Sequence, residues 1–154
     1  MTTDLLNRRL TTSRLYDLSF NSVSTSDNGW KISIQGKCIQ HSVELFELLS
    51  EYLYANDVPF KVATENRFAM INEYPQQALK AMTIYCPDGF DFNELCEAVY
   101  SRTIEYKGWY NINTPDGYSH YAGGLFIRND RDLNGSYVPA SNVNYIPRYK
   151  INVG

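Results

Sequence analysis

Hydrophobic and polar positions alternate most clearly in the stretch 29–36, which reads Gly-Trp-Lys-Ile-Ser-Ile-Gln-Gly. Side chains of an extended strand alternate between its two faces, so the tryptophan and both isoleucines are predicted to face a core and Lys31 to lie on a polar wall. The stretch 58–62 repeats this pattern, with its phenylalanine and second valine on one face and Lys61 on the other. A lone lysine on a short strand is more often solvated than functional, so the pattern alone assigns these lysines no role.

Apolar residues recur at helical spacing in the segments between and after these strands. The clearest helix begins at Ser42, a candidate N-cap, and continues to about Asn56 with apolar residues every three or four positions. Asp91 and Glu94 form a capping-box pair ahead of a second helix that runs to about residue 102. The other segments predicted before residue 80 are a helix over 4–18, a loop over 19–28 and a short helix over 65–72.

The second half of the chain is predicted to complete the sheet. Its remaining elements are a strand over 81–86, a turn over 87–89, a strand over 109–113, a turn over 114–117, a strand over 118–127, and polar, irregular chain from 128 with a turn at 134–135. Gly123 and Gly124 fall inside the last strand, where paired glycines are typical of a bulge or of a close approach of the backbone. The whole pattern predicts an α+β fold with a mixed, largely antiparallel sheet flanked by two main helices.

Charge and cysteine content narrow the classes of partner. The 154 residues carry 14 Lys and Arg against 17 Asp and Glu, a formal net charge of −3, whereas a protein that grips nucleic acid needs a basic surface. No apolar run approaches the length of a membrane span. The three cysteines follow neither disulfide nor metal-ligand spacing. We therefore expect a cytoplasmic protein with free thiols and no metal, nucleic acid or membrane partner.

Several short motifs follow one another along the chain. They are Gly-Trp-Lys-Ile-Ser-Ile (29–34), Val-Pro-Phe-Lys (58–61), a Tyr-Pro loop (74–75), a strand ending at Pro87, Tyr-Ala-Gly-Gly-Leu (121–125), and tail segments 134–139 and 145–147. In this order they resemble the amino-terminal lyase domain of class III and class IV lanthipeptide synthetases, which in turn resembles the phosphothreonine lyases injected by some bacterial pathogens. The resemblance implies an α+β domain over 29–154 that needs no cofactor, preceded by a helix and loop over 1–28.

In that family, phosphate is eliminated from phosphoserine or phosphothreonine in a peptide. The resemblance assigns Lys61 as the base that removes the α-proton and Lys31 as the cation that stabilises the developing charge. A lysine acts as such a base only when its pKa falls from about 10.4 toward 7–8. The family's proton donor is a histidine two residues after the position of Lys31.

The chain departs from the family at the residues that protonate and bind the phosphate. Ser33 stands where the family has its histidine, and a hydroxyl is far too weak an acid to replace an imidazolium. General acid catalysis contributes a factor of about 10² to 10⁴ in rate, so this change alone is enough to abolish measurable elimination. The family's phosphate-binding arginines are also replaced, at Gln76, within 113–116 and at Tyr121.

Other residues offer partial replacements. His120 is a candidate acid from another strand, although a hairpin histidine is more often a plain surface residue, and Lys80 or Arg67 offers positive charge. His120 and Tyr121 fall on opposite faces of a strand, so only one of them faces a shared cleft. The predicted substrate-binding residues are Ser33, Lys80, His120, Tyr121, Gly123 and Gly124.

Three functions remain open from the sequence. The leading interpretation is a stand-alone lyase-like domain whose catalytic set has decayed and which binds a peptide or protein, with or without a phosphate group. The second is an active phosphoserine/phosphothreonine lyase with a rewired general acid. The third is a structural or interaction protein, such as a viral or host-defence component, that packs its 13 tyrosines against a partner.

Overall fold

The chain folds into one sheet with helices on both sides. The structure, a computed structural model, describes residues 3–21, 27–71, 80–108, 114, 117–132 and 134–138. Its elements in chain order are α1 (Thr3–Thr12), β1 (Asp17–Phe20), β2 (Asp27–Gln35), α2 (Ile39–Ala55), β3 (Phe60–Ala63), α3 (Glu65–Ile71), β4 (Lys80–Pro87), α4 (Phe92–Arg102), β5 (Ser119–Ala122) and β6 (Leu125–Asn129).

The six described strands pair in the order β1-β3-β4-β2-β6-β5, and every pair among them is antiparallel. Strands β2 and β3 both pair with β4, so they run parallel to each other with β4 between them and α2 as their connection. The predicted α+β class with a largely antiparallel sheet is confirmed.

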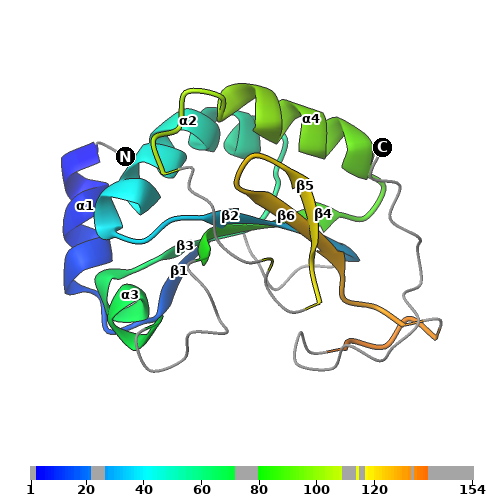
Figure 1. Ribbon diagram of the computed structural model, residues 1–154, viewed down its shortest axis with the longest axis horizontal. Helices are drawn as coiled ribbons and strands as arrows, with labels where there is room; N and C mark the ends of the chain where they lie inside the picture. The colour runs from blue at the N-terminus through cyan, green and yellow to red at the C-terminus, as the bar shows by residue number, and fades with distance from the viewer. Residues whose placement is uncertain are drawn as a thin grey trace.

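Helices α2 and α4 pack beside each other on one face of the sheet (Figure 1). The apolar positions of β2 belong to the buried core, and Ile32 and Ile34 are fully buried. Trp30 stacks on Phe92 of α4 with 4.6 Å between ring centroids. Helix α3 lies on the other side of the sheet, next to β3 (Figure 1). The two long helices therefore cover one face of the sheet, and α3 lies at the β3 end of the other face.

The N-terminal segment joins the same sheet and core. The prediction of a helix reaching residue 18 and a loop after it was wrong, because residues 17–20 form the edge strand β1 paired with β3. Leu18 and Phe20 alternate with polar residues and are both buried, and the Phe20 ring stacks on Phe60 at 4.9 Å. The alternation over only four residues was too short to outweigh the helical spacing before it.

The two long helices begin in different ways. The predicted start of α2 at Ser42 was wrong, because the N-cap is Cys38 and Ser42 lies inside the helix. The buried Ser42 hydroxyl instead donates to the carbonyl oxygen of Ala63 at 2.9 Å, which ties α2 to β3. Asp91 is the N-cap of α4 as predicted, and its carboxylate accepts the backbone N–H groups of Asn93 and Glu94.

The hairpin in the second half differs from the predicted one. Residues 118–127 are not one arm, because β5 and β6 pair with each other and Gly123-Gly124 is the turn that connects them. Gly123 has a φ of +53°, in the left-handed region that two-residue hairpin turns require. Paired glycines here mark a turn rather than a bulge inside a strand. The predicted strand over 109–113, the loop with Gln76 and the tail beyond 138 lie outside the described residues.

Candidate functional site

Three lysines, Lys31, Lys61 and Lys80, lie on the side of the sheet opposite α2 and α4, which we call the lysine face. Across this face Lys61 pairs with Thr83 of β4, and Thr83 pairs in turn with Ser33 of β2. Lys31 lies two residues before Ser33 on the same strand and therefore on the same side. Lys31 and Lys61 do not come from neighbouring strands, because β4 lies between β2 and β3.

Lys31 is held by an ion pair at one end of this face. Its Nζ lies 3.4 Å from Asp130 Oδ2, and the two side chains are only 13% and 9% exposed. Burial lowers the pKa of Lys31, Asp130 opposes this effect, and the positive charges of Arg128 and Lys61 add to the lowering. Lys31 is therefore a fixed cation with a carboxylate partner, which suits charge stabilisation better than proton abstraction.

The Tyr118 ring connects Lys31 with Lys80. Nζ of Lys80 lies 4.4 Å from the ring centre and Nζ of Lys31 lies 5.9 Å from it. Burial and the neighbouring cations Lys31, Arg67 and Arg128 lower the pKa of Lys80 to about 8, while Asp17 acts in the opposite direction. Tyr118 is 8% exposed, and burial raises the pKa of its hydroxyl, so the ring stays neutral between the two ammonium groups.

Lys61 lies on the same face, on β3, two strands from Lys31. Its Nζ is 5.7 Å from the centre of the Tyr85 ring, and Tyr85 pairs across the sheet with Lys31. Burial raises the pKa of Asp17 on β1, and the charges of Arg67, Lys61 and Lys80 lower it. Asp17 is thus an electrostatic neighbour of both Lys61 and Lys80.

Most of the charged groups that the structure describes on the lysine face are cations. The charged groups that act on one another here are Lys31, Lys61, Lys80, Arg67, Arg128, Asp17 and Asp130. Among these residues, five cations face two carboxylates, although the chain as a whole carries a net charge of −3. Partly desolvated cations that gather on one face favour the binding of an anion.

The other predicted site residues do not all lie on the lysine face. Ser33 lies centrally on the lysine face and is 1% exposed. His120 pairs with Phe126 at the edge of this face, and its Nε2 lies 2.7 Å from the carbonyl oxygen of Gly123, in its own hairpin. Tyr121 lies on the opposite side, where its ring contacts Tyr100 of α4 at 6.3 Å between centroids, so it is not brought together with the lysines.

Sequence reasoning missed Tyr118, Arg128 and Asp130. Arg128 was assigned to the irregular tail, yet it lies in β6, is fully buried, and donates a hydrogen bond to the carbonyl oxygen of Val138. The alternation of Leu125 and Ile127 with their neighbours was a usable signal, because it places Arg128 on the face away from the core. Nothing comparable in the sequence places Tyr118 between two lysines.

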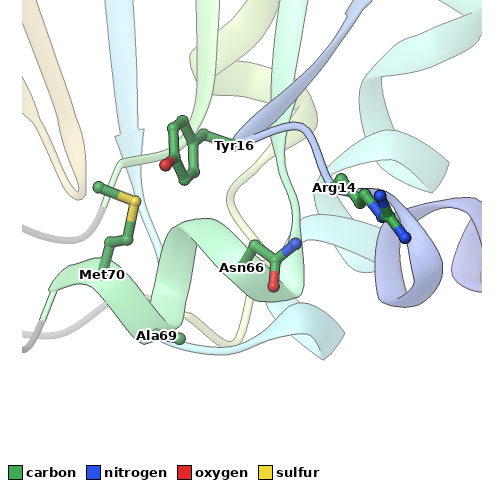
Figure 2. Close-up of a pocket in the computed structure, with 5 residues that line it drawn as sticks. All are labelled: Arg14, Tyr16, Asn66, Ala69 and Met70. Carbon is green, nitrogen blue, oxygen red and sulfur yellow. The ribbon is translucent and has the colours of Figure 1, made fainter.

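A surface cavity of about 340 Å³ lies between α3 and the segment that joins α1 to β1. Its lining residues are Arg14, Tyr16, Asn66, Ala69 and Met70. Figure 2 shows the Tyr16 ring and the Met70 side chain reaching toward each other above α3. None of the predicted site residues lines this cavity.

Other classes of site find no support in the described part of the chain. There, no three or more His, Cys, Asp or Glu side chains gather as metal ligands. No helix among those residues has the length and apolar character needed to cross a membrane. In comparisons with known proteins, no family model and no curated protein matches this sequence. The resemblance to lanthipeptide synthetase lyase domains therefore stays a prediction.

Proposed function

We propose that this protein is a stand-alone lyase-like domain that binds a phosphorylated serine or threonine of a peptide or protein on its lysine face. The observation that carries the proposal is the pair of ammonium groups from Lys31 and Lys80 over one Tyr118 ring, on the same side of the sheet as Lys61. A phosphate monoester brings up to two negative charges and several acceptor oxygens to such a cluster.

In the leading form of the proposal, the domain binds the phosphorylated residue but no longer eliminates its phosphate. Ser33 occupies the centre of the lysine face, where the resemblance calls for a histidine. Lys31 is engaged by Asp130, and Tyr121 lies on the far side of the sheet. Binding without turnover follows from a retained cation cluster and a lost proton donor. The free thiols of Cys38, Cys86 and Cys96 support a reducing, cytoplasmic setting.

A second candidate function is phosphate elimination with a different proton donor. The observation that favours it is the lowered pKa of Lys80, about 8, which gives the face an amine that exchanges its proton near neutral pH. Elimination needs neither metal nor oxidant, because the electron pair of the broken C–H bond forms the double bond while the C–O bond breaks with its electron pair on oxygen.

The binding proposal is tested with a pair of short blocked peptides that differ only in carrying phosphoserine or serine between glycine and alanine residues. We expect isothermal titration calorimetry to detect binding of the phosphoserine peptide and no binding of the serine peptide. We expect Lys31→Met or Lys61→Met to weaken binding of the phosphopeptide about ten-fold or more. Lys107→Met, at an exposed position after α4, is the matched control and leaves binding unchanged. Equal affinity for both peptides, or no binding, overturns the proposal.

Mass spectrometry of the same mixtures distinguishes the two candidate functions. An intact phosphopeptide after long incubation supports binding without turnover. Loss of phosphoric acid from the peptide, abolished by Lys61→Ala, overturns the decayed form and establishes the lyase.

A further inference from the structure

The cavity of about 340 Å³ beside α3 has an apolar end and a cationic end. The Tyr16 ring and the Met70 side chain lie at one end, Arg14 lies at the other, and Asn66 lies between them (Figure 2). Asn66, Ala69 and Met70 are three and four residues apart on α3, so one side of this helix lines the cavity. Pockets for whole small molecules span about 300 to 1,000 Å³, so this volume suits a single large side chain.

The lining favours an aromatic side chain with a negative charge beside it. Methionine sulfur and a tyrosine ring both make favourable contacts with aromatic groups, and Tyr16 is 52% exposed, so part of its surface is left to cover. Arg14 forms no ion pair with a carboxylate that the structure describes. Asn66 donates a hydrogen bond to the carbonyl oxygen of Ser13 at 2.7 Å, which ties the backbone next to Arg14 to α3. A carboxylate at this end of the cavity would complete a charge pair with Arg14.

Two pairs of consecutive residues connect the cavity with the lysine face. Tyr16 lines the cavity, and Asp17, the next residue, is an electrostatic neighbour of Lys80. Asn66 also lines the cavity, and Arg67, the next residue, acts on Lys80 as well. The two surfaces therefore adjoin each other at the start of β1 and along α3.

Lys80 turns toward the lysine face through a β-bulge at the start of β4. Strand alternation alone would place Lys80 with Met82, on the side of the core. The pairing shifts instead, because Ile34 faces Met82 while the next residue, Gln35, faces Lys80. Ala81 is the extra residue of this bulge and packs in the core. The bulge thus places a cation at the end of β4 that is nearest the cavity.

The backbones of Tyr16 and Lys80 lie two strand spacings apart. The Thr64 N–H donates to the carbonyl oxygen of Tyr16, so these two residues are neighbours across the sheet. Lys80 lies two residues before Met82, whose partner Val62 lies two residues before Thr64. Tyr16, Thr64 and Lys80 therefore form one row, and the two ends of this row are about 10 Å apart. An extended peptide covers that distance in about three residues.

We propose that the cavity beside α3 is a second recognition site for the partner of the lysine face. It holds an aromatic side chain of the partner, about three residues from the phosphorylated residue, while an acidic residue next to the aromatic one pairs with Arg14. This inference rests on the proposed binding of a phosphorylated residue and adds to it the sequence that surrounds this residue. Two contacts on one chain raise affinity because the second contact forms within the complex.

Isothermal titration calorimetry tests the proposal with blocked peptides of glycine and alanine that carry one phosphoserine. A Phe-Glu pair is placed at spacings from one to six residues on either side of the phosphoserine, and Ala-Ala replaces it in the reference peptides. We expect Phe-Glu to strengthen binding about ten-fold at a spacing of about three residues, and by less at the shortest and longest spacings.

Ala69→Trp fills the cavity from the exposed side of α3 and is expected to remove the ten-fold gain. Ala55→Trp places the same side chain at the exposed end of α2 and is the matched control, in which the gain persists. Arg14→Met is expected to abolish a preference of about three-fold for Phe-Glu over Phe-Gln. Arg8→Met, at an exposed position of α1, keeps this preference.

The outcomes separate this inference from the proposed function. Equal affinities of the Phe-Glu and Ala-Ala phosphopeptides at every spacing overturn the second site and leave the binding of phosphoserine intact. A gain that survives Ala69→Trp also overturns the second site, because the aromatic contact then lies elsewhere. Absence of binding by every phosphopeptide overturns the proposed function, and the inference with it.

Discussion

Lys31 and Asp130 form an ion pair at 3.4 Å in which both side chains are nearly buried. Removing one partner of such a pair leaves an uncompensated charge, which costs more than the pair contributes. We expect Asp130→Asn to lower the free energy of unfolding by about 3 kcal/mol at pH 7, measured by urea titration.

Asp27→Asn is the control for that loss. Asp27 pairs with Arg131 at 4.0 Å in a more exposed position, and the asparagine oxygen still accepts the backbone N–H of Gly29. We expect a change below about 1 kcal/mol. Equal losses for the two variants would show that Asp130 does not neutralise a buried charge.

Lys80 should make stability depend on pH in a defined direction. Its pKa falls from 10.5 to about 8 on folding, so below pH 8 the folded state carries the full cost of a buried ammonium. Between about pH 8 and 10.5 the unfolded chain binds the additional proton, and stability rises with pH. We expect Lys80→Met to raise the free energy of unfolding by about 2 kcal/mol at pH 7, with the gain fading toward pH 10.

The difference between wild type and Lys80→Met isolates this effect from other titrating groups. Burial raises the pKa of Cys86 to about 11 and of Cys96 to about 12, and both thiols titrate alike in the two proteins. Urea titrations at several pH values provide the measurement, with Lys107→Met as control. A gain of the same size at pH 7 and pH 10 contradicts the prediction.

Gly29 allows β2 to pass close to the segment that carries Asp130. Its φ is +90°, and a Cβ there would lie 2.5 Å from Cγ of Arg131 and 2.6 Å from Oδ1 of Asn129. We expect Gly29→Ala to cost about 3 kcal/mol in the free energy of unfolding, from backbone strain together with overlap. Thermal or urea unfolding provides the measurement.

Gly89 is the matched control, because it has a similar φ of +82° and no atom within 4 Å of an added Cβ. Gly89→Ala therefore reports backbone strain alone, about 1 kcal/mol. If both substitutions cost the same, the close approach at Gly29 does not constrain the fold.

Ser33→His restores the residue that the resemblance calls for. We expect it to raise the rate of phosphate elimination from the phosphoserine peptide by about 100-fold or more. Because Ser33 is 1% exposed, the larger ring should also cost about 1 to 3 kcal/mol of stability. Mass spectrometry of the peptide gives the rate, and urea titration gives the stability.

Ser101→His places the same ring on α4, on the other side of the sheet, and serves as the control. Ser101 is exposed and lies away from the lysine face, so no gain in rate is expected. An equal rate for the two histidine variants contradicts a special role for position 33.

Local patterns in the sequence were sufficient for most elements and for the side of the strand on which each predicted lysine lies. The alternation in 29–36 and 58–62 depends only on backbone geometry, so the placement of Lys31 and Lys61 opposite the core follows from it. The same reasoning failed at residues 17–20, where a short strand alternation follows helical spacing. It also failed at Gly123-Gly124, where paired glycines are compatible with either a bulge or a turn.

The composition of the lysine face was decided by long-range pairing. The insertion of β4 between β2 and β3, the bulge at Ala81 that turns Lys80, and the arrival of Arg128 and Tyr118 beside Lys31 depend on which strands meet and in which register. A period of two says which residues share a face, but it says nothing about the neighbouring strand. The sequence by itself determined the strands and their polar sides, and only the tertiary structure decided which charges stand together.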